Sequence, residues 1–256
     1  MDEILFNYFK KGCNNAVESD PNLESDKPLL IRGIASKRHI YKCQDTKRDF
    51  YYVDTGYFGN YPSKENPIGK KLFHRIVKNE LQLTRMLDVP SDRWDEISKT
   101  DSRLQFKGWK TNGSHILLLL PTPKACKFYG FVYEEWVDNT ISTLKANTDR
   151  KIIIREKPSR KDRKVVSSVY DQMDGAFATV SLNSIASIES VLYGIPSFAS
   201  VPCCGTPLVS TDFSKIETPY YPDERLIHQK CNSLAYNQFT TEEMISGKAW
   251  KILHKY

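Results

Sequence analysis

The sequence predicts an α/β protein in two parts, with a parallel sheet in the second half and a smaller, β-rich first half. Three observations carry this prediction. Short apolar segments alternate with helix-length segments from residue 114 onward, which is typical of a parallel sheet wrapped by helices. The first half has apolar segments of strand length without that alternation. A cluster of small polar residues follows the apolar segment 176–180, where open parallel sheets bind ligands.

Seven segments of the second half follow one another in the order that right-handed strand–helix–strand crossovers require. Each predicted strand is a short apolar run, and each predicted helix has ten or more residues. The predicted strands are 114–120, 151–155, 176–180 and 197–201, and the predicted helices are 133–146, 162–173 and 184–193.

The first half is less regular. Its predicted strands are 28–34, 40–43 and 50–54, followed by a further segment at 72–79.

A polar connector is expected at 88–113, because it contains Gly108 and the turn-forming pair Asn112 and Gly113. A last helix is predicted at 241–254, where threonines precede the acidic pair Glu242 and Glu243. The expected domains are therefore 1–113, 114–235 and a C-terminal helical segment, 236–256, which packs back on the first domain.

Composition narrows the class of protein. The 256 residues are 40% hydrophobic, which is enough for a real core, and no apolar run approaches the roughly 20 residues that span a bilayer. The first residues place acids before a short apolar patch, unlike a signal peptide, so the expected location is cytoplasmic. The six cysteines show no C-x-x-C pair and no zinc-type spacing, so reduced thiols and no metal site are expected.

Positive charge is concentrated in the first half. The net charge is +6, and between Lys27 and Arg85 there are 13 Lys or Arg residues against 5 Asp or Glu, interleaved with aromatic residues. Such a surface binds polyanions such as a nucleic-acid backbone, but it is equally the solvated surface of a β-rich core. The candidate acceptor-binding residues are Lys37, Arg38, Lys70, Lys71, His74 and Arg75.

The most informative segment is the polar turn after strand 176–180. Ser181, Asn183 and Ser184 open the next helix, which also carries Glu189. Small polar residues at a helix start bind anions such as a diphosphate. Glu189 either accepts hydrogen bonds from ribose hydroxyls or simply faces solvent. The alternative is that the three polar residues only cap the helix.

Two cations follow the neighbouring predicted strand. Arg155 and Lys157 lie two residues apart before Pro158, so they project the same way from the carboxyl end of strand 151–155. Together they suit a diphosphate that leaves with negative charge when no metal assists. The alternative is an ordinary pair of surface charges.

Asp54 is the candidate general base. It ends an apolar strand before a glycine turn, where an acid is either a turn former or a base aimed into an interdomain cleft. His74 and His115 are reserve bases. A phosphate loop, the G-x-G-x-x-G fingerprint and the G-x-S-x-G elbow are all absent from the sequence, which disfavours P-loop NTPases, dinucleotide dehydrogenases and serine hydrolases.

Several segments together resemble phage and bacterial glycosyltransferases of the two-domain GT-B type. The Asn183-Ser184, Glu189 and Gly194-Ile195-Pro196 piece also looks like the donor-side segment of capsule and Kdo transferases. The resembling segments are 52–59, 154–158, 183–196, 234–240 and 243–250.

This resemblance implies two Rossmann-like lobes with a cleft, the N-terminal lobe being reduced and β-rich. It also implies a nucleotide-sugar donor, with UDP-sugars expected first, and no metal requirement. By the resemblance, the donor-site residues are Arg155, Lys157, Ser181, Asn183, Ser184 and Glu189, and Asp54 is the catalytic base.

The leading functional hypothesis is a glycosyltransferase that acts on a hydroxyl acceptor. The phage-like resemblance and the basic first half favour 5-hydroxymethylcytosine in phage DNA, which would receive glucose or arabinose after base flipping in the host cytoplasm. The alternatives are a transferase of lipopolysaccharide or capsule synthesis, and a non-catalytic nucleic-acid-binding protein.

Overall fold

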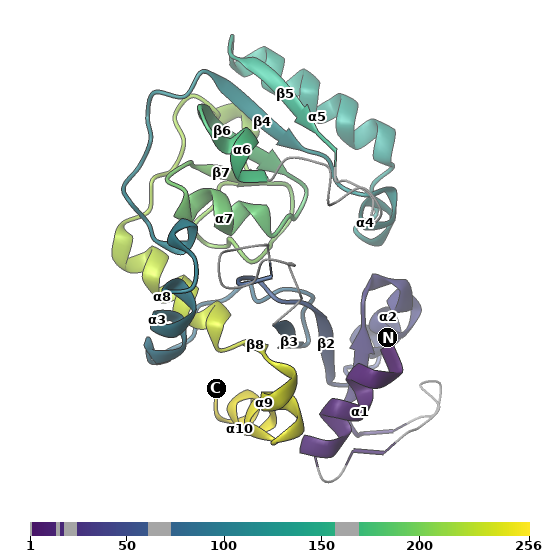
Figure 1. Ribbon diagram of the computed structural model, residues 1–256. Helices are drawn as coiled ribbons and strands as arrows, with labels where there is room; N and C mark the ends of the chain where they lie inside the picture. The colour runs from purple at the N-terminus through teal and green to yellow at the C-terminus, as the bar shows by residue number, and fades with distance from the viewer. Residues whose placement is uncertain (1, 14–15, 18–24, 61–72, 157–168) are drawn as a thin grey trace. The chain divides into compact units, whose positions relative to one another are not determined.

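The computed structural model describes residues 2–13, 16–17, 25–60, 73–156 and 169–256. They divide into two compact units (Figure 1). Unit 1 comprises Met1–Ser102 with Gln229–Tyr256, and unit 2 comprises Arg103–His228. The expected boundaries at 113 and 235 differ from these. Residues 103–113 group with unit 2, where Lys110 N donates to Gly194 O at 2.7 Å and Trp109 Nε1 donates to Pro222 O at 3.2 Å.

Unit 2 contains an all-parallel sheet of four strands in the order β5-β4-β6-β7. Every residue of β6 is buried, which explains why it is continuously apolar apart from Thr179 and Ser181. The strands are β4 (His115–Leu119), β5 (Lys151–Arg155), β6 (Ala176–Ser181) and β7 (Ser197–Ala199). All four predicted strands of this half are therefore present.

Helices cover both faces of the sheet in unit 2 (Figure 1). On one face α4 (Pro123–Phe128) and α5 (Tyr133–Asn147) pack on alternate sheet residues such as Ile116 and Val180. On the other face α6 (Val169–Met173) and α7 (Ala186–Leu192) pack on residues such as Leu117. The part of the predicted helix 162–173 before Val169 lies outside the described residues.

Unit 1 is built on a mixed sheet in the order β1-β2-β3-β8. β1 (Leu29–Arg32) is parallel to β2 (Phe50–Thr55), and β3 (His74–Lys78) is antiparallel to both β2 and β8 (Gln238–Phe239). The predicted strands at 28–34, 50–54 and 72–79 correspond to β1, β2 and β3. The predicted strand at 40–43 is wrong, because this segment lies in α2 (Lys37–Asp45), where Ile40 and Cys43 occupy one buried helix face.

The other helices of unit 1 include three that form one layer. They are α1 (Asp2–Gly12), α9 (Thr241–Ile245) and α10 (Lys248–Lys255), and they pack on sheet residues such as Tyr51 and Ile76. The single helix predicted at 241–254 is interrupted at Gly247, whose φ of 78° is left-handed. Thr240 and Glu243 form a capping box at the start of α9.

Two more helices are α3 (Asp92–Ser98) and α8 (Glu224–Ala235). Short 3₁₀ turns occur at Ile34–Ser36, Ser102–Leu104 and Phe213–Lys215. Within the described ranges, none of the helices has the length and apolar character that crossing a bilayer needs. The same part of the chain shows no cluster of three or more His, Cys, Asp or Glu side chains arranged to hold a metal ion.

Candidate functional site

The carboxyl edge of the sheet in unit 2 has a topological switch point. From β4 the chain passes to β5 on one side, and β6 lies on the other side of β4. Open α/β sheets bind ligands outside the carboxyl ends of strands where the order reverses in this way. The turn 181–184, which begins at the last residue of β6, is located at this point.

One row of residues runs across that edge. Arg155, Leu119, Ser181 and Ala199 are in register on the four strands, so their side chains project to the same face of the sheet. Leu119 packs in the cluster beneath α6 and α7, which identifies this face. Arg155 is half-buried on the edge strand, and β4 separates it from Ser181, a distance of about 10 Å across two strand spacings. The two residues thus share a face, but they are not on adjacent strands.

The hydroxyls of the 181–184 turn bind backbone groups. Ser181 Oγ accepts from Ser184 N at 3.2 Å, and Ser184 Oγ accepts from Ala186 N at 3.2 Å. Both hydroxyls therefore serve the turn itself, and Ile185, the N-cap residue of α7, has no side-chain capping hydrogen bond. Asn183 is half-buried in the same turn.

Glu189, predicted to bind ribose, is buried in the structure. All seven residues of α7 are buried, and Glu189 is 1% exposed. A polar contact holds this helix to the sheet, because Thr179 Oγ1 in β6 lies 2.9 Å from Ser190 Oγ in α7. α7 is therefore fixed behind the 181–184 turn. Lys157, the second predicted donor-site cation, lies outside the described residues.

Asp54, the predicted base, is hydrogen-bonded at the end of β2 in unit 1. Its Oδ2 accepts from Tyr52 Oη at 3.0 Å and from Arg75 Nη2 at 3.2 Å, and its Oδ1 accepts from Thr55 N at 2.7 Å. The side chain is 38% exposed, so solvent still reaches it. Asp54 therefore orients Arg75 and the strand end, whatever further role it has.

The predicted acceptor-binding residues have different surroundings. Arg75 is 6% exposed, and its guanidinium donates to Leu81 O, Thr55 O and Asp54, so the structure uses it inside unit 1. His74 is also buried, whereas Arg38 is exposed and Lys37 half-exposed at the start of α2. Lys70 and Lys71 lie outside the described residues. The reserve base His115 bonds Gln172 O through Nε2 at 3.4 Å.

Sequence reasoning missed three buried polar residues that organise unit 1. Lys230 is fully buried and donates to the carbonyls of residues 83, 84 and 85 at 2.8 to 3.2 Å. Arg93 is paired with Glu243 and also donates to Ala235 O and Gln238 O. Gln238 Oε1 accepts from the backbone N–H groups of Tyr57 and Phe58, which fixes the glycine turn after Asp54. The only sequence feature that pointed to these contacts was the resemblance of segments 234–240 and 243–250 to glycosyltransferases, since these segments contain Gln238 and Glu243.

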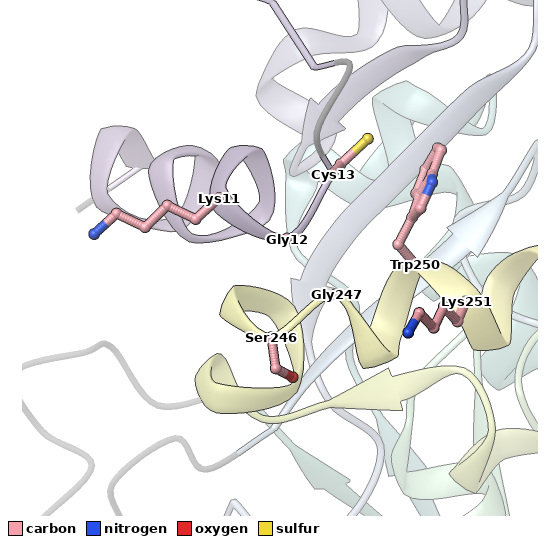
Figure 2. Close-up of a pocket in the computed structure, with 7 residues that line it drawn as sticks. All are labelled: Lys11, Gly12, Cys13, Ser246, Gly247, Trp250 and Lys251. Carbon is pink, nitrogen blue, oxygen red and sulfur yellow. The ribbon is translucent and has the colours of Figure 1, made fainter.

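A hollow of about 390 Å³ lies in unit 1 where α1 ends beside the α9–α10 junction (Figure 2). Its charged lining residues, Lys11 and Lys251, do not converge. Figure 2 shows the Lys11 side chain extending away from the Gly12–Gly247 contact, while Cys13 and Trp250 project to the other side. This hollow therefore shows no arrangement of groups around a common ligand position.

Comparison with known proteins gives matches by structure. No protein-family model matches the chain, and a search of curated protein sequences finds no match. The structure is similar to "Thermosulfurimonas dismutans KpsC, beta Kdo 2,7 transferase", with a TM-score of 0.54 and 14% identity over 98% of this chain and 95% of that chain. It is also similar to "Thermosulfurimonas dismutans KpsC, beta Kdo 2,4 transferase", with a TM-score of 0.53 and 11% identity over 91% of this chain and 88% of that chain. The fold is therefore α/β of the GT-B-like type, and neither neighbour is named as a DNA-modifying enzyme.

Proposed function

We propose that this chain is a glycosyltransferase that moves a sugar from a nucleotide-sugar to a hydroxyl of a lipopolysaccharide- or capsule-type glycan. The observation that carries the proposal is the polar 181–184 turn at the switch point of a parallel sheet in a GT-B-like fold. Such a position is suited to a phosphorylated ligand, and both structural neighbours are named as sugar transferases.

In this proposal the diphosphate of the donor lies outside the carboxyl ends of β4 and β6. Arg155 supplies a cation on the same face as Ser181, and Asn183 and Ser184 supply polar groups from the turn. A guanidinium stabilises the charge that develops on a leaving diphosphate, so the reaction is proposed to need no metal. Lys157 is proposed to assist Arg155, and Glu189 to support the turn from behind.

The acceptor is proposed to be a glycan because of the neighbours' names. The sequence favoured hydroxymethylcytosine in phage DNA, and the comparisons give that acceptor no support. Of the cationic residues proposed for a polyanion, Arg75 is buried and hydrogen-bonded within unit 1. Lys37 and Arg38 remain proposed contacts for anionic groups of the acceptor.

Asp54 is proposed as the general base, and its contacts define a sharp test. Asp54→Asn keeps the shape of the side chain but removes its charge, while Arg75 stays buried beside it. We expect turnover to fall at least about 100-fold, the usual contribution of general base catalysis, with nucleotide affinity unchanged. Turnover near the wild-type rate would remove Asp54 from the mechanism.

Nucleotide binding separates the enzyme from a non-catalytic nucleic-acid-binding protein. Thermal unfolding is measured with UDP, CMP, GDP and ADP, each at about 100 times a micromolar dissociation constant. A bound nucleotide at that excess stabilises the fold by about 2.7 kcal/mol. UDP is expected to act most strongly, and the absence of any shift contradicts the transferase proposal.

The acceptor is then tested by mass. The protein is incubated with nucleotide-sugars and either a Kdo-containing glycan or DNA that contains hydroxymethylcytosine. A mass increase of one sugar on the glycan supports the proposal, and an increase on the DNA alone returns the acceptor to the earlier hypothesis. Unmodified cytosine DNA is the matched control.

A further inference from the structure

A second hollow, of about 370 Å³, opens on unit 2 along one face of α5, and we call it the α5 hollow. Its volume falls in the range of small-molecule sites, about 300–1,000 Å³. One side is a single helix face, because its residues recur at spacings of three and four. These residues are Val132, Glu135, Trp136, Asn139, Thr140 and Thr143.

The α5 hollow has two aromatic side chains in its lining, Phe131 and Trp136. Phe131 is 37% exposed, although large aromatic side chains are usually covered. It follows Gly130, whose left-handed φ of 80° ends α4, and its own N–H donates to Cys126 O at 2.9 Å. Trp136 adds a nearly buried ring whose Nε1 donates to Ser200 Oγ at 2.9 Å. The backbone hydrogen bond fixes the main chain at Phe131, so its Cα position at the rim of the hollow is defined.

Polar groups surround this surface. Asn139 is exposed, and within the described part of the chain no hydrogen bond of its side-chain amide is found, so both its donor and its acceptor face solvent. Ser200 Oγ accepts from Trp136 and keeps its own proton for donation. Thr211 contributes another hydroxyl, and Glu135 a carboxylate. The hollow thus offers both donors and acceptors beside an aromatic ring.

The charge of the α5 hollow limits its ligand. Glu135 is the one charged side chain among the described residues that line it. An anionic ligand such as a diphosphate therefore meets repulsion and no cation, unlike at the edge that contains Arg155. An uncharged sugar ring fits these features, because its C–H groups stack on the negative face of an aromatic ring while its hydroxyls both donate and accept. We propose that the α5 hollow is a binding subsite for an uncharged saccharide.

This subsite lies next to the 181–184 turn but on the other face of the sheet. Ser200 N donates to Ser181 O at 3.0 Å, so the two strand ends are direct neighbours. The Ser200 side chain contacts Trp136 on the α5 face, whereas Ser181 projects toward the α7 face. The inference goes beyond the proposed function, because saccharide binding here requires no nucleotide.

The test is ligand-observed NMR on the full chain without nucleotide. The probes are methyl β-glucoside, N-acetylglucosamine and maltose, with glucuronate as the charged match for glucose. We expect saturable binding of at least one neutral sugar. Glucuronate is expected to bind about fivefold more weakly than methyl β-glucoside, because Glu135 repels its carboxylate.

Paired variants locate the binding. Phe131→Ala is expected to weaken neutral-sugar binding by about tenfold, through loss of the aromatic surface. The control Tyr220→Ala removes an aromatic residue of unit 2 that is 46% exposed outside the hollow, and it leaves binding unchanged. Glu135→Gln raises glucuronate affinity toward that of glucoside, whereas Glu134→Gln, at the neighbouring position outside the lining, does not.

Three results overturn the inference. These are no saturable binding of any neutral probe, equal binding by wild type and Phe131→Ala, and displacement of methyl glucoside by uridine or cytidine, which identifies a nucleobase pocket. Thermal unfolding checks that Phe131→Ala is folded, and Asn139→Ala, at an exposed position, gives a second measurement if it is not. Sugar binding that is unchanged in Arg155→Ala, when nucleotide binding is weakened, separates this subsite from the proposed donor site.

Discussion

Replacing Arg155 with alanine is expected to weaken nucleotide binding by about 10- to 150-fold. Arg155 is half-buried at the carboxyl end of β5, on the same sheet face as Ser181. A hydrogen bond between a guanidinium and a phosphate contributes about 1.5–3 kcal/mol, and each 1.4 kcal/mol changes the dissociation constant tenfold. Loss of Arg155 therefore removes one charge-assisted contact and leaves the 181–184 turn intact.

Lys151 provides the matched control because it is a cation at the other end of the same strand. Four residues of extended chain separate the two positions by about 13 Å, which exceeds the screening length of about 8 Å at physiological ionic strength. Lys151→Ala therefore changes the net charge equally but leaves affinity within about twofold of wild type.

Isothermal titration calorimetry with UDP and CMP measures both variants, and their melting temperatures establish that both are folded. Equal dissociation constants for Arg155→Ala and wild type refute the proposed diphosphate position. An equal loss in Lys151→Ala and Arg155→Ala points instead to a general charge effect and also refutes it.

Three further predictions concern stability. Burial raises the pKa of the Glu243 carboxyl, but hydrogen bonds and the charge of Arg93 outweigh burial and hold that pKa below 4.5. The Glu243–Arg93 pair therefore stabilises the fold fully above pH 4.5 and loses this contribution as the pH falls. In urea unfolding at acid pH, Glu243→Gln is expected to lose less stability with falling pH than wild type does. Lys230→Met leaves the carbonyls of residues 83, 84 and 85 without their shared donor and is expected to cost about 3 kcal/mol in urea unfolding. Gly194→Ala places an alanine at a left-handed φ of 83° and brings its Cβ to 2.2 Å from Gly108 O. The melting temperature of the variant is therefore expected to fall by several degrees, and an unchanged melting temperature contradicts the close approach of Gly194 and Gly108.

The sheet of unit 2 could be predicted because its physical cause is local. A parallel strand buried on both faces is largely apolar along its length, as β4 is after His115 and β6 is apart from Thr179 and Ser181. Among the helices between them, α5 is long enough to show its own periodicity. The α5 hollow was missed because the face that lines it mixes polar and apolar residues, which is also the pattern of an ordinary solvated helix.

Unit 1 was harder to predict because short segments carry too few residues to establish a period. Ile40 and Cys43 fit a strand of four residues as well as one turn of helix, and the structure has the helix. The break between α9 and α10 depends on Gly247, where the carbonyl of Gly12 lies 2.7 Å from an added Cβ. Contacts of this kind join distant parts of the chain, and no local pattern contains them.

The order of the strands around the candidate donor site is another feature that local sequence patterns do not predict. Arg155 and Ser181 end strands that are consecutive in the sequence, so proximity was expected, but β4 lies between them. That arrangement argues against Arg155 and Ser181 binding the same phosphate, because their backbones are about 10 Å apart. It strengthens the case for a ligand above β4 and β6, because the insertion of β4 is what creates the switch point. A nucleotide-sugar is long enough to contact both positions through different groups, so Arg155→Ala and Asn183→Ala are expected to weaken binding additively, within about 0.5 kcal/mol in a double-mutant cycle. A coupling energy above about 1 kcal/mol would mean that both side chains hold the same phosphate.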